Sequence, residues 1–126
     1  MKLQQVFEAR ESLSRLMELR DLPFKISYAL SKQCRHATSD LTFIEQERQK
    51  LVKELGELQE DGSFQVKDPQ GLETLQDNFE QLLEVESEFD YKPVAIPLEV
   101  AEKMTTLAPL DWSRLEPFLN VQDANA

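Results

Sequence analysis

The stretch FKISYALSKQCRHATSDLTFIEQERQKLVKEL, residues 24–55, decides the fold. Its apolar residues recur every three, four or seven positions, and they are Ile26, Leu30, Ala37, Leu41, Ile44, Leu51 and Leu55. At 3.6 residues per turn, this spacing predicts one amphipathic helix of about eight turns. Pro23 suits the first turn of that helix, and Gly56 is placed to cap its end by adopting a left-handed conformation.

A second amphipathic segment, residues 3–20, precedes this long helix. Its apolar residues also recur at helical spacing and include Val6, Phe7, Leu13, Leu16 and Met17. Residues 21–23, Asp-Leu-Pro, interrupt the pattern, because proline disfavours helical geometry at the residue before it. Two helices joined by so short a link predict an antiparallel helical hairpin. Since the second helix is the longer, a third helix or a second subunit should cover the part that the first leaves free.

Beyond Gly56, short alternating segments flank Asp61-Gly62, a dipeptide that is typical of a two-residue β-hairpin turn. An isolated hairpin is marginal in water, so this one should lean on a helix or gain a third strand. Asp68 and Pro69 then predict the N-cap and the first position of a third helix, which the apolar spacing extends to about residue 86.

The rest of the chain predicts smaller elements. Residues 94–96 lie between two prolines, which suits an edge strand beside the hairpin. Residues 109–119 predict a short C-terminal helix that Pro117 limits, and residues 122–126 predict a frayed tail. The expected fold is an α+β domain over residues 1–121, predominantly α: an antiparallel helical hairpin plus a third helix, with a small antiparallel sheet of two or three strands.

The composition is that of one folded, soluble domain. A chain of 126 residues with 40% hydrophobic residues holds one modest core, and seven Phe and one Trp argue against disorder. No stretch approaches the roughly 20 apolar residues that span a bilayer, and the charged first residues do not resemble a secretory signal. With Cys34 as the one cysteine, no internal disulfide forms, so an intracellular location is expected.

Charge is unevenly distributed along the chain. Residues 1–53 carry ten Lys/Arg against seven Asp/Glu, residues 54–91 carry one against twelve, and residues 92–126 carry three against five. The net charges of +3, −11 and −2 sum to the −10 of the whole chain. Because so acidic a surface repels phosphates, direct nucleic-acid binding is not expected. The first two segments are complementary, which favours head-to-tail stacking of copies into a ring or filament.

The acidic excess gathers in the predicted third helix, as carboxylates at successive spacings of three or four residues: Glu73, Asp77, Glu80, Glu84 and Glu88. One interpretation is a protein-binding or nucleic-acid-mimicking surface. A second is a site for a divalent cation. A third is a solvated helix face, free or paired with arginines of the first two helices, namely Arg10, Arg15, Arg35 and Arg48.

Two aromatic residues near the C-terminus, Trp112 and Phe118, are further candidates for partner contacts. Buried aromatic side chains dominate binding hot spots, so both residues are candidate anchors for a partner. Packing against the preceding helices is favoured over this role, because a short helix without apolar support has little reason to form.

The sequence offers little for catalysis, metal binding or cofactors. Glycine-rich phosphate loops and paired CxxC motifs are absent from it. Cys34 and His36 lie about 200° apart around a helix, so they face away from each other and do not form a nucleophile and base. His36 and Asp40 share a helix face, but two ligands alone make weak support for a metal site. No enzymatic activity, cofactor or metal is therefore expected.

The order of these features resembles a family of small proteins of unassigned function from tailed phages and prophages. The resemblance rests on LPFKISYALSK at 22–32, IEQERQKL at 44–51, the acidic Asp-Gly hairpin, the helix at 79–86 and LAPLDWSRLEPFL at 107–119. It spans most of the chain and brings no catalytic residues with it.

This resemblance implies a structural or assembly role in a phage particle, carried out through protein–protein contacts. The protein would be made in the host bacterial cytoplasm and be incorporated in the virion, with phage structural proteins or other copies of itself as partners. The alternative is a phage-encoded inhibitor of a host defence or regulatory protein that presents the acidic helix face.

Overall fold

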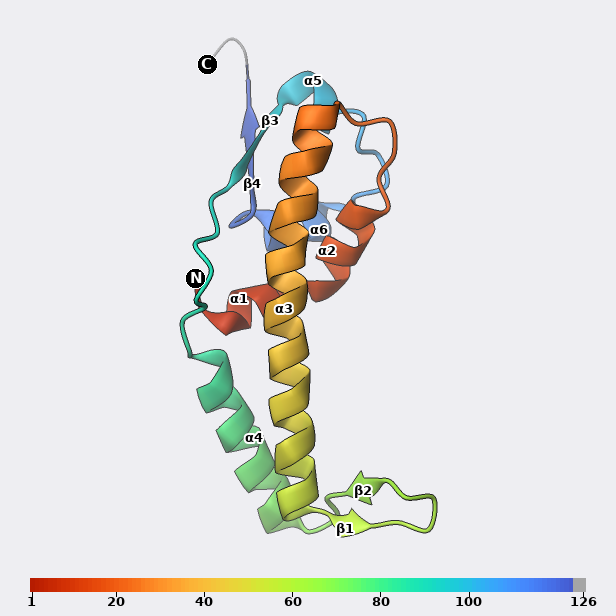
Figure 1. The fold of residues 1–126 in the computed structure, drawn as a ribbon, viewed down its shortest axis with the longest axis vertical. Helices are drawn as coiled ribbons and strands as arrows, with labels where there is room; N and C mark the ends of the chain where they lie inside the picture. Colours follow the sequence, from red (N-terminus) through yellow and green to blue (C-terminus); the bar gives the residue numbers. More distant parts are fainter. Residues whose placement is uncertain (124–126) are drawn as a thin grey trace.

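The computed structural model describes residues 1–123 and has an α+β fold that is predominantly α (Figure 1). In chain order, its elements are α1 (Leu3–Glu8), α2 (Arg10–Met17), α3 (Phe24–Leu55), β1 (Glu57–Leu58), β2 (Phe64–Gln65), α4 (Pro69–Leu83), β3 (Val94–Pro97), α5 (Leu98–Ala101), α6 (Pro109–Leu115) and β4 (Leu119–Gln122). No helix within this part of the chain is long and apolar enough to cross a membrane.

The long central helix is confirmed with the bounds that the sequence predicts. α3 begins at Phe24, directly after Pro23, and ends at Leu55, directly before Gly56. At 1.5 Å per residue its 32 residues span about 48 Å. Gly56 is extended, with φ −102°, so the predicted left-handed cap is wrong. Glycine is required there for space instead, because a Cβ would lie 2.5 Å from the carbonyl oxygen of Val52.

The predicted single helix over residues 3–20 is two helices. The chain bends at Ala9, so that α1 lies across α3 while α2 rises beside it (Figure 1). The bend lets both short helices bury apolar residues against α3, Leu3 and Val6 from α1 and Leu13 and Leu16 from α2. One straight helix would keep its apolar stripe in contact with α3 over only part of its length. The free energy gained by burying these residues outweighs the small stabilisation that one continuous helix would bring.

α4 runs back along the C-terminal half of α3 and covers the part that α1 and α2 leave free (Figure 1). Its N-terminus is at Pro69, as predicted, but it ends at Leu83 rather than near residue 86.

The last buried residue of α3 is Ile44, and α4 contains no buried residue. We call residues 45–83 the arm, and the rest of the described chain the head. Within the arm only Val66 is buried.

The β-hairpin at the tip of the arm pairs β1 with β2 in antiparallel register, with Leu58 opposite Phe64. The Gly62 N–H donates to the Gln59 carbonyl at 3.1 Å, and Gly62 adopts φ +88°. The predicted two-residue Asp-Gly turn is therefore wrong in detail. The loop is one residue longer, with glycine in the left-handed position that follows a tight turn.

The predicted third strand does not join this hairpin. β3 pairs in parallel with β4, in a separate sheet within the head. α4 carries the chain away from the tip of the arm, so β3 lies far from the hairpin (Figure 1). The predicted fraying at Gln122 is also wrong, because Gln122 pairs with Pro97 at the end of β4. Residues 124–126 of the predicted tail lie outside the described residues.

A buried carboxylate joins the two ends of the chain within the head. Asp111 of α6 accepts hydrogen bonds from the Ser12 hydroxyl and an Arg15 guanidinium nitrogen, both at 2.7 Å, and from the Ala108 N–H at 2.9 Å. Donation by Ser12, then by Ala108 and Arg15, lowers the pKa of Asp111 below its ordinary range. This carboxylate therefore fixes α6 against α2.

The buried polar residues Gln33 and Asp40 of α3 hold the segment between α4 and β3. The Gln33 side-chain amide donates to the carbonyls of Lys92 and Phe118, both at 3.1 Å. Asp40 accepts from the hydroxyls of Ser87 and Tyr91, both at 2.6 Å. Burial, followed by this hydrogen bond, raises the pKa of Tyr91, which stays protonated as a donor.

We predict that Asp111 makes stability dependent on acid pH. Its pKa is lower in the folded chain than in the unfolded chain, where it is about 3.9. The stabilisation it contributes is thus complete above about pH 5 and is lost progressively as the pH falls through the unfolded and then the folded pKa. Urea unfolding between about pH 2 and 7 should show a shallower loss of stability for Asp111→Asn than for wild type. Equal pH dependence would contradict this role.

Candidate protein-binding surfaces

The acidic residues predicted from the sequence form a stripe on the outer face of α4. Glu73, Asp77 and Glu80 are exposed on the helix, and Glu84 follows at its C-cap. Steps of four, three and four residues place these carboxylates on one helix face. We call these four residues the acidic stripe. Glu88, the fifth predicted member, lies beyond the end of α4, so the helical spacing does not extend to it.

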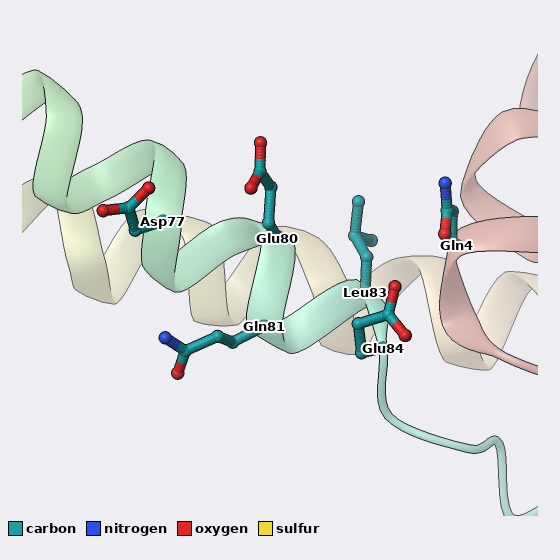
Figure 2. Close-up of a pocket in the computed structure, with 6 residues that line it drawn as sticks. All are labelled: Gln4, Asp77, Glu80, Gln81, Leu83 and Glu84. Atoms are coloured by element: carbon teal, nitrogen blue, oxygen red, sulfur yellow. The ribbon is translucent and has the colours of Figure 1, made fainter.

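The C-terminal end of the stripe borders a shallow pocket of about 550 Å³ between α1 and α4. It is lined by Gln4, Asp77, Glu80, Gln81, Leu83 and Glu84. Figure 2 shows Glu80 and Leu83 pointing to the same side of α4 and Gln81 pointing away from them. Because carboxylates and amides dominate this lining, the pocket suits cationic or hydrogen-bonding groups more than an apolar ligand.

Contacts with α1 fix the position of this end of α4. Lys2 Nζ donates to Glu84 Oε2 at 2.6 Å, and this hydrogen bond raises the pKa of Lys2. The backbone N–H of Leu3 donates to the carbonyl of Val85 at 2.9 Å. The rings of Phe7 and Phe79 meet edge to face, with centroids 5.4 Å apart. The arm is therefore attached to the head at a defined joint.

Of the alternatives left open, pairing of the stripe with Arg10, Arg15, Arg35 or Arg48 is not found among residues 1–123. Arg15 pairs with Asp111, Arg48 pairs with Glu45, and Arg10 lies 4.1 Å from the ring centre of Phe7. Among residues 1–123, the stripe's one ion pair is that between Lys2 and Glu84. Three of its four carboxylates thus face solvent without a cation. In the same range, no group of three or more His, Cys, Asp or Glu is arranged to hold a metal ion.

A second surface, which the sequence did not predict, is a groove of about 930 Å³ between α3 and β3. Its α3 wall presents the cationic residues Lys25 and Lys32 beside Tyr28, which is 72% exposed. Its other lining residues include Ile26, Ala29, His36, Asp90, Lys92, Pro93, Val94, Pro97, Glu99 and Val100. We call it the basic groove. In the sequence, the helical spacing of Lys25, Tyr28 and Lys32 is the one pattern that relates to this groove.

The residues weighed for chemistry have structural roles. Cys34 is buried, and burial raises the pKa of its thiol to about 11, which leaves it protonated and poorly nucleophilic at neutral pH. His36 stacks on Phe89, with ring centroids 4.4 Å apart, rather than lying on a solvated face. Asp40 is occupied by its two hydroxyl donors. These side chains hold the head together.

The two C-terminal aromatic residues differ in exposure. Phe118 is completely buried and meets the Tyr91 ring edge to face at 5.5 Å, so its inclusion among partner-binding residues is wrong. Trp112 is half-buried and packs against the core of the head. The favoured interpretation for both, packing on the helices, agrees with these positions.

Comparison with known proteins returns nothing to guide the assignment: no protein-family model, curated protein or solved structure matches the chain. The function is therefore inferred from the two surfaces themselves, the acidic stripe and the basic groove.

We predict that Phe118 contributes to stability as a core residue. Phe118→Ala should lower the free energy of unfolding by about 3–5 kcal/mol, because it removes a buried ring and leaves a cavity. The matched control is Leu110→Ala, at a residue that is 58% exposed, and it should change stability by less than about 0.5 kcal/mol. Urea titration measures both. A similar small effect for both variants would show that Phe118 is not a core residue.

Proposed function

We propose that this protein is a non-catalytic protein-binding component that acts in the assembly of a phage particle, with the arm as its main contact surface. One observation carries the proposal: the arm projects from the head with almost no core of its own. Within residues 45–83, Val66 is the one buried residue.

The apolar residues of the arm are covered only in part. Leu51, Leu55, Leu75 and Phe79 are half-buried, and Leu72 remains 47% exposed. When only two helices pack together, the faces that point away from the contact remain in water. A further protein surface packed on the arm would therefore bury more of these apolar side chains. Apolar burial stabilises by about 25 cal/mol per Å², which favours a partner along the arm.

The charge of the arm supports the same role. Its stripe presents carboxylates that no cation of the described chain neutralises, apart from Glu84. Such a surface increases the rate of encounter with a cationic protein and disfavours acidic ones. The same property supports the second candidate, inhibition of a host defence or regulatory protein through a nucleic-acid-mimicking helix face. The identity of the partner separates the two candidates.

A photo-crosslinking amino acid at Asp77, introduced into the protein during phage production, tests the proposal. We expect adducts with a capsid, portal or tail protein, or with another copy of this chain, because Asp77 is exposed on the stripe. The same amino acid at Glu11, an exposed residue of α2 in the head that does not line the groove between α3 and β3, is the matched control and should give few adducts.

Mass spectrometry of the adducts decides between the outcomes. Adducts with a host protein alone would replace assembly by the inhibitor role. Equal yields from both positions, or none from Asp77, would contradict a specific contact through the arm.

A further inference from the structure

We infer that the basic groove of one copy binds the acidic stripe of a second copy. The inference rests on the proposed function, in which the arm is a protein-binding surface, and it names the partner. The groove is lined by residues from the N-terminal half of α3. The stripe belongs to α4, which lies beside the C-terminal half of α3 (Figure 1).

The charges of the two surfaces are complementary. Lys25 and Lys32 are seven residues apart and so share one face of α3. Within residues 1–123, no carboxylate forms an ion pair with either of them. The two acidic residues of the groove, Asp90 and Glu99, belong to the opposite wall, where Asp90 lies 3.7 Å from Lys92. The α3 wall therefore presents two lysines that no carboxylate of the described residues neutralises.

The two surfaces also match in the spacing of their charges. Lys25 and Lys32 are seven residue steps apart on α3, as are Glu73 and Glu80, and Asp77 and Glu84, on α4. At 1.5 Å per step, each pair is separated by about 10 Å along its helix. One helix laid along the other therefore brings two pairs of opposite charges into register, which a single surface ion pair would not achieve.

Apolar residues accompany the charges of both surfaces. Ile26, Ala29 and Val94 line the groove, and Tyr28 presents an exposed ring at its edge. On α4, Leu72 is 47% exposed and lies about 100° around the helix from Glu73. The contact would thus bury apolar surface as well as pair charges, and apolar burial supplies affinity that charge alone seldom does.

The contact cannot form within one chain. α4 packs on the C-terminal half of its own α3, and the joint between Leu3 and Val85 fixes its upper end. The stripe therefore reaches only the groove of another copy. If two copies each place their stripe in the groove of the other, the product is a closed two-fold dimer. If each copy instead binds the groove of a further copy, the product is a ring or an open chain.

Charge reversal with light scattering coupled to gel filtration tests the inference. Wild type should self-associate in about 0.1 M salt and dissociate in about 1 M salt, where the Debye length falls to about 3 Å. The groove variant Lys25→Glu/Lys32→Glu and the arm variant Asp77→Lys/Glu80→Lys should each weaken association at least about tenfold. Arg20→Glu/Lys103→Glu makes the same charge change at two exposed residues of the head that line neither the groove nor the arm, and it should behave as wild type.

Mixing the two blocked variants gives the most specific result. The groove variant keeps an intact stripe and the arm variant keeps an intact groove, so an equal mixture should form a 1:1 heterodimer. Helical circular dichroism confirms that both variants are folded. A monomeric wild type in low salt, or a mixture that stays monomeric, would overturn the inference.

An oligomer that the arm variant loses and the groove variant keeps would also overturn it, in favour of arm-to-arm contact. Failure here together with crosslinks from Asp77 to another structural protein would leave the proposed function standing.

Discussion

The buried stripe of α3 ends at Ile44, and the rest of the structure depends on this limit. Between Leu30 and Ile44 the helix buries six residues, and α1, α2 and the C-terminal elements pack around this part of the helix to form one core. Beyond Ile44 the helix continues for three turns without burying a residue. One continuous helix therefore belongs to a packed head and to an arm with little core, and the arm's surfaces face solvent because nothing further packs on them.

Polar residues within the same buried stripe determine where the second half of the chain lies. Gln33 and Asp40 bind the segment that leads from α4 to β3, and Asp111 fixes α6 against α2. Within residues 1–123, every buried side-chain nitrogen and oxygen has a hydrogen-bond partner, so these groups stabilise a specific arrangement without unsatisfied polarity. By holding this segment beside α3, they also create the groove between α3 and β3.

Local patterns account for the parts of the fold that the sequence predicted. The long apolar period predicted the extent of α3, Asp68 and Pro69 predicted the start of α4, and helical spacing predicted four of the five residues proposed for the acidic stripe. The bend at Ala9 carries no local signal, because alanine is the best helix former and only packing against α3 favours a break. The pairing of β3 with β4 and the basic groove arise from segments distant in sequence, which periodicity does not reveal.

The division into head and arm is measured most directly by hydrogen exchange of the wild-type protein in about 1 M salt, where contacts between charged surfaces are screened. Our account predicts that amides of α3 between Leu30 and Ile44 exchange only with global unfolding, whereas those of α4 and of α3 after Ile44 exchange faster through local opening of the arm. Protection of α4 equal to that of the head would contradict the account, because it would show that the arm has a stable core of its own.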